Sequence, residues 1–307
     1  MSAIQIFIWF LLYSLQLWNL SLVVVLPAMM ASLLRSEDDW KRALAKELFS
    51  PLMRFQFILF VLAVLIYFGG DVLPVFGQFR DGYMAIEQIQ SGFVLLSIIC
   101  LAIATGGVFF CRRNASTKPQ QVPNYLYGIV VLNVVFLVLF VATSSTLFTA
   151  SEGQPVHFSA FDIVTRMIHV LFSAIALLGA TVAFAAREIA KKNAEHAEKI
   201  AKLGLKWMLI GGSVQVFAGV ALLMSIGMGA FPVPIGHILL SFGILCAIGV
   251  VIMSAMAFGK TGSLLKIARA TAMTVVLTFF LMVGMRVADL VKRYSSPIQS
   301  PDQTAQQ

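Results

Sequence analysis

The chain has 307 residues, of which 59% are hydrophobic and only 12% carry a charge. A soluble domain carries about 25% charged residues, so this composition excludes a protein that covers its surface in water. The net charge of +8 comes from basic residues in short loops, and no basic face with interleaved aromatics is present, which argues against nucleic acid as a partner.

Apolar runs of about 20 residues, the length that crosses a lipid bilayer, recur along the whole chain. The sequence therefore predicts an all-α polytopic membrane protein with about eight transmembrane helices. In chain order these helices are expected at 3–34, 51–76, 90–111, 124–149, 159–187, 203–230, 235–259 and 263–291. Pro51, Pro123 and Pro234 stand at or near helix starts, where proline is tolerated.

Basic residues are concentrated on one side of these predicted helices. The connecting segments 35–54, 112–118, 187–206 and 260–269 together hold 17 of the 22 Lys and Arg residues. The positive-inside rule then predicts that these segments are cytoplasmic. Both termini would lie on the outer side of a bacterial cytoplasmic (inner) membrane.

A short internal repeat indicates two four-helix units. The string Gly92-Phe-Val-Leu-Leu-Ser97 matches Gly236-His-Ile-Leu-Leu-Ser241 at an offset of four helices. Because four is an even number, the two units are expected to be parallel. The predicted organisation is an N-terminal unit at 1–150, a C-terminal unit at 151–294 and a disordered tail at 295–307.

The C-terminal unit carries the ionisable side chains that mark candidate sites in a bilayer. On the helix expected at 159–187, steps of four, three and four residues place one polar group after another on a single face: Asp162, Arg166, His169 and Ser173. Asp162 and Arg166 are spaced to pair with each other. In the repeat, Gln16 of the first unit corresponds to His169 of the second unit. The imidazole is therefore specific to the second unit.

His169 and His237 are the candidate axial ligands of a b-type haem. Haem iron takes neutral imidazole nitrogens from facing helices, and both histidines are expected in the outer half of the bilayer, roughly 8 Å apart in depth. Arg166 and Arg286 would hold the propionates. Small residues would make room for the flat ring: Ser173, Ala174, Gly236 and Gly243. His157, in the preceding loop, is the alternative second ligand.

The string Arg166-Met-Ile-His169-Val-Leu-Phe-Ser-Ala resembles the Arg-x-x-His start of a ligand helix in membrane b-type cytochromes, such as hydrogenase and formate dehydrogenase cytochrome subunits. This resemblance implies that His169 is an axial ligand. A tryptophan often follows that histidine in the family, whereas Val170 follows it here. The string through Gly179 is also similar to the Arg-x-x-His helix of copper-export and membrane urate-hydroxylase-like proteins, some of which have eight spans. Both resemblances cover about one helix.

The leading hypothesis is an integral membrane electron-transfer subunit with a b-type haem near the outer face. It would pass electrons between quinone and a periplasmic or membrane redox partner. Copper transport or handling is the second hypothesis, because imidazole and the outer methionines suit Cu(I); these are Met224, Met228, Met282 and Met285. A non-redox scaffold subunit is the third.

Overall fold

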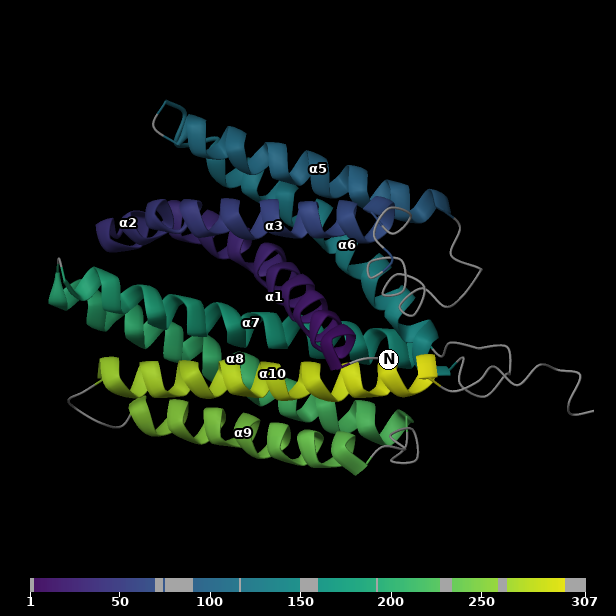
Figure 1. Ribbon diagram of the computed structural model, residues 1–307. Helices are drawn as coiled ribbons and strands as arrows, with labels where there is room; N and C mark the ends of the chain where they lie inside the picture. Colours follow the sequence, from purple (N-terminus) through teal and green to yellow (C-terminus); the bar gives the residue numbers. More distant parts are fainter. Residues whose placement is uncertain are drawn as a thin grey trace, which may run out of the picture.

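The computed structural model describes residues 3–69, 74, 91–115, 117–149, 160–191, 193–226, 234–258 and 264–295. These ranges are almost entirely helical (Figure 1). The helices are α1 (Ala3–Leu34), α2 (Asp39–Glu47), α3 (Phe49–Phe68), α5 (Ser91–Asn114), α6 (Val122–Thr149), α7 (Ala160–Ala190), α8 (Ala194–Ile226), α9 (Pro234–Phe258) and α10 (Leu264–Ser295). Each of the eight helices expected from the sequence is present, so the prediction of an all-α chain is confirmed.

Six helical stretches of the described residues are long and apolar enough to cross a membrane. They are Ala3–Leu34, Asp39–Phe68, Val164–Ala190, Ala194–Ala221, His237–Phe258 and Leu264–Met285. Large apolar side chains also cover the outside of the bundle; Phe217 and Met224 are 76% and 81% exposed. Such a surface is stable in lipid and not in water, so the chain is a multi-pass membrane protein.

Two details differ from the expected helices. The basic connector 35–54 contains α2, a short helix whose Leu44 and Ala45 are buried. Most of the connector 187–206 is helical and is divided between two helices, because α7 ends at Ala190 and α8 begins at Ala194. At the start of α8, Lys199 Nζ lies 2.6 Å from Glu195 Oε1, an i,i+4 ion pair on the helix surface.

The long helices form two closed groups of four. In the first group the helices contact one another in the cyclic order α1, α3, α5, α6, and in the second group in the order α7, α8, α9, α10. The groups meet through α1–α7, α1–α10 and α6–α7. If α1 is exchanged with α7 and α6 with α10, the same three contacts between the groups result. A parallel four-plus-four repeat predicts this arrangement.

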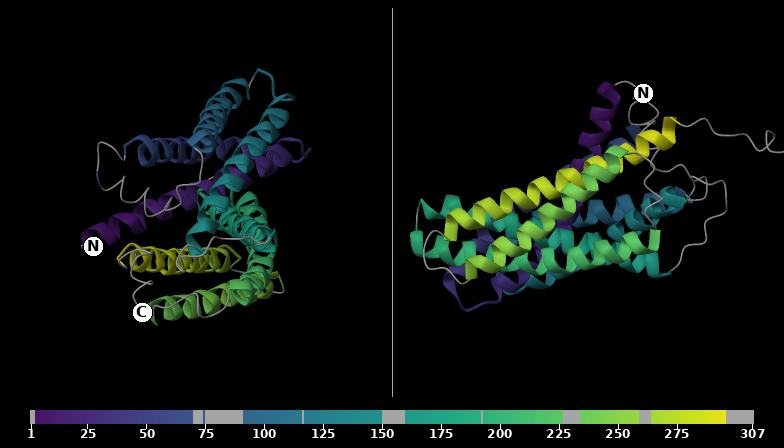
Figure 2. Two further views of the ribbon diagram at one scale, coloured as in Figure 1. Left: turned by 90° about the vertical axis from the view of Figure 1, so that its right-hand side faces the viewer. Right: turned by 90° about the horizontal axis from the view of Figure 1, so that it is seen from below.

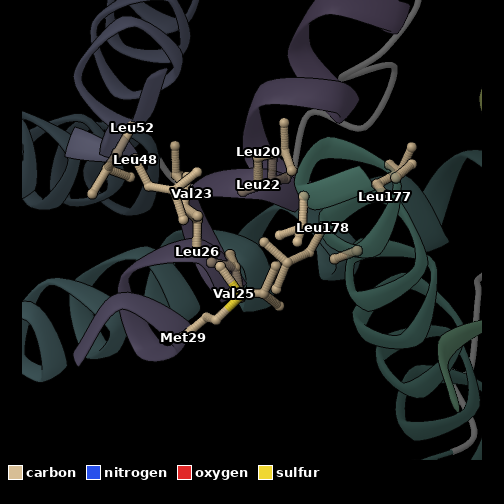
Figure 3. Close-up of a cluster of buried hydrophobic side chains, with 14 of the residues drawn as sticks. Leu20, Leu22, Val23, Val25, Leu26, Met29, Leu48, Leu52, Leu177 and Leu178 are labelled. Atoms are coloured by element: carbon tan, nitrogen blue, oxygen red, sulfur yellow. The ribbon is translucent and has the colours of Figure 1, made fainter. Parts of the chain in front are cut away.

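Apolar side chains of α1 join the two groups. Figure 3 shows Val23 beside Leu48 and Leu52, at the start of α3, and Val25 turned toward Leu178 of α7. Nearer the start of α1, Trp18 packs against Phe279 of α10 with 5.2 Å between ring centroids. α1 is therefore the helix on which both units pack (Figure 2).

The helix ends next to the basic connectors gather at one end of the bundle. In Figure 1 this is the left end, where α2 lies, α7 meets α8, and α9 meets α10. The start of α1 and the end of α10 lie at the opposite end, which is called the terminal end below.

Candidate functional site

Small residues bring α7 and α8 into unusually close contact. A Cβ added at Gly211 would lie 2.5 Å from the backbone nitrogen of Ala176, and one added at Gly179 would lie 2.6 Å from the carbonyl oxygen of Gly204. Real Cβ atoms do not approach other atoms so closely, so only glycine permits this backbone separation. Gly211 and Gly219 of α8 both face α7.

His169 occupies the terminal part of this α7–α8 interface. A Cβ on Gly219 would lie 3.4 Å from the imidazole Cε1 and 3.6 Å from Nδ1, so that edge of the ring rests on the Gly219 backbone. The ring interacts with the backbone carbonyl of Gln215, one turn earlier on α8. The Nδ1 atom is buried and has no hydrogen-bond partner among the described residues. The residue as a whole is half-buried. The accessible part of His169 is therefore not the Nδ1 edge.

The same level of the second unit contains Met282. Gly212 of α8 lies against Val250 and Val251 of α9, so Gly219 is level with position 243 or 244 of α9. A Cβ on Gly243 would lie only 2.7 Å from Cε of Met282. The space beside Gly243, where a flat ring was expected to fit, is occupied by the flexible end of the Met282 side chain.

The structure places the other predicted site residues as follows. Arg166 lies one turn before His169 on α7 and is half-buried. His237 lies in the first turn of α9 and is also half-buried. The backbone of Arg286 lies in α10, but its side chain, like that of Asp162, is outside the described residues, and His157 lies outside them altogether.

His169 and His237 are at different depths in the bundle. With position 243 of α9 level with His169, His237 lies six residues, or roughly 9 Å, closer to the terminal end. α8 and α10 also contact each other between α7 and α9. This is close to the depth difference of roughly 8 Å expected from the sequence.

The surroundings of His169 can be compared with those of a metal-ligating imidazole. A ligating imidazole is normally held through one nitrogen by a carbonyl or carboxylate, while the other nitrogen stays accessible to the metal. His169 meets this pattern only in part, because its Cε1–Nδ1 edge packs against the α8 backbone but Nδ1 has no hydrogen-bond partner among the described residues. Among the described residues, no group of three or more His, Cys, Asp or Glu could hold a metal ion without haem.

Two buried amides form a polar contact that the sequence did not predict as a pair. Gln56 of α3 and Asn133 of α6 are fully buried and exchange two hydrogen bonds of 3.1 Å. The two residues are 77 positions apart in the sequence, so no local pattern could reveal the contact. It is part of the packing of the first unit and lies outside the histidine-bearing unit.

Comparison with known proteins does not assign the chain to a family. No family model matches the chain, and no curated protein and no solved structure matches it.

Proposed function

We propose that this chain is a membrane electron-transfer subunit that binds a b-type haem through His169. The observation that carries the proposal is the position of this imidazole, which is fixed along one edge by the backbone of α8 within the span Val164–Ala190. An ionisable group inside a bilayer is costly, so it persists where it has a task. Bound haem would supply a one-electron iron couple.

Arg166 gives the site a cationic neighbour. It precedes His169 by three residues, so the two side chains are on the same side of α7, with Arg166 closer to the terminal end. A half-buried guanidinium at this position would hold a haem propionate by charge-assisted hydrogen bonds. Arg286 is proposed as the second propionate partner, and His237 or His157 as the second iron ligand.

The distribution of charge supports an orientation for the chain. The helix ends next to the four basic connectors gather at one end of the bundle (Figure 1), and basic connectors are retained in the cytoplasm. We therefore infer that the terminal end faces outward in a bacterial inner membrane. Electrons would pass between quinone in the bilayer and a periplasmic or membrane redox subunit.

The experiment is a reduced-minus-oxidised visible spectrum of the detergent-purified chain, made with ample haem. The wild-type protein is expected to give the α-band of a b-type haem, and His169→Ala is expected to lose it. His196→Ala is the matched control, because His196 lies on the charged start of α8. An unchanged spectrum in His169→Ala would remove the proposal.

Two further variants separate the ligand hypotheses. If His237 supplies the second ligand, His237→Ala changes the spin state of the iron while His169 still retains the haem. If His157 supplies it, the same change appears only in His157→Ala. A chain that contains copper and no haem would favour metal handling, and a chain that contains neither would favour the scaffold hypothesis.

A further inference from the structure

Two buried amide oxygens of α1 have no hydrogen-bond donor among the residues that the structure describes. Gln16 and Asn19 are 7% and 2% exposed, and Gln16 Oε1 and Asn19 Oδ1 are buried and accept no hydrogen bond. The Asn19 side-chain nitrogen donates to the Leu15 carbonyl at 2.5 Å, which turns Oδ1 away from the helix backbone. A bare carbonyl oxygen inside an apolar bundle costs free energy that a donor would recover.

Both oxygens belong to one face of α1. Gln16, Asn19 and Val23 are spaced i, i+3 and i+7 and therefore lie on the same side of the helix. Val23 packs beside Leu48 and Leu52 (Figure 3), and its carbonyl accepts a hydrogen bond from Asn133 of α6. The Gln16–Asn19 face is thus directed into the first unit, between α3 and α6.

We propose that this face binds a neutral ligand that donates two hydrogen bonds through hydroxyl groups. A cation is not required, because both oxygens belong to uncharged amides. An acceptor-only ligand would leave both oxygens unsatisfied. Hydroxyl donors at this depth have two sources, a quinol head group from the bilayer and a pair of ordered waters. The site does not involve His169, so it stands independently of haem binding.

The test compares thermal unfolding of the wild-type chain with that of the double variant Gln16→Met, Asn19→Leu in detergent. These replacements keep the side-chain lengths and remove the acceptor oxygens. Duroquinol is the quinol probe, and duroquinone, which has no hydroxyl donor, is its matched control. Ser32→Leu controls for added apolar surface, because Ser32 is exposed on the same helix.

If the ligand is a quinol, duroquinol raises the unfolding temperature of the wild-type chain, duroquinone raises it less, and the double variant loses the shift. If the ligand is water, duroquinol has no effect, but the double variant unfolds about 2–4 °C lower for each lost hydrogen bond. The proposal is overturned if the double variant is as stable as wild type or more stable, and duroquinol either shifts the unfolding temperature of neither chain or shifts both equally. His169→Ala should leave every one of these results unchanged.

Discussion

The side-chain Nδ2 of Asn133 donates a hydrogen bond of 2.9 Å to the carbonyl oxygen of Val23, the carbonyl that Pro27 leaves without a helical donor. In an α-helix the N–H of a residue bonds to the carbonyl four residues earlier, and proline has no N–H. Inside a membrane no bulk water can replace the missing donor. Asn133 therefore allows a proline in the middle of α1 and joins α1 to α6.

We expect Asn133→Leu to lower the free energy of unfolding by about 1–3 kcal/mol, because it leaves the Val23 carbonyl and the Gln56 amide without their partner. The loss should be smaller when Pro27→Ala is already present, since the new N–H of residue 27 can bond to Val23. Denaturant unfolding of the four members of this double-mutant cycle measures the coupling. Equal losses in both backgrounds would show that the Val23 carbonyl does not depend on Asn133.

The α7–α8 contact gives a second prediction. Gly211→Ala should destabilise the chain by about 1–3 kcal/mol, because the new methyl group would overlap the Ala176 backbone and force the helices apart. Gly249→Ala is the control, because its Cβ would meet nothing within 4 Å. Thermal unfolding in detergent should show a lower transition temperature for Gly211→Ala only. Similar stability of the two variants would mean that α7 and α8 separate at little cost.

The helices were largely predictable, because a bilayer imposes length and hydrophobicity on every span. Two features were not. α2 lies in a basic connector, and its amphipathic pattern covers only nine residues. The break between the end of α7 at Ala190 and the start of α8 at Ala194 was also not predictable, since the alanine, lysine and glutamate residues around it all favour helix.

The site was predictable in part. Burial cost and the polar face of the fifth helix single out His169, and the structure places that residue against α8. Which glycine faces which side chain depends on helix rotation and register, and apolar runs do not specify either. For this reason the sequence could not show that Met282 fills the space at Gly243, or that Gly219 supports His169.

The proposed orientation can be tested with single cysteines in a chain whose native Cys100, Cys111 and Cys246 are replaced by serine or alanine. Glu198→Cys, on the exposed start of α8, should react with a membrane-impermeant maleimide only after the cells are opened. A cysteine added after Gln307 should react in intact cells that have a permeable outer membrane. The reverse labelling pattern would place the basic connectors outside and contradict the proposed outward-facing terminal end.

Gly219 provides the last prediction, because it supports the His169 ring without being a ligand. In Gly219→Ala the new methyl group would lie 3.4 Å from Cε1 of His169, so the ring must shift by a few tenths of an ångström. If the ring ligates haem, this shift should weaken haem retention and broaden the α-band. Gly107→Ala is a matched steric control, since its Cβ would lie 3.1 Å from Ile129 in the first unit. Both variants should lose similar, modest stability, but only Gly219→Ala should change the haem spectrum. A spectral change in both variants, or in neither, would mean that the α8 backbone does not position the ligand.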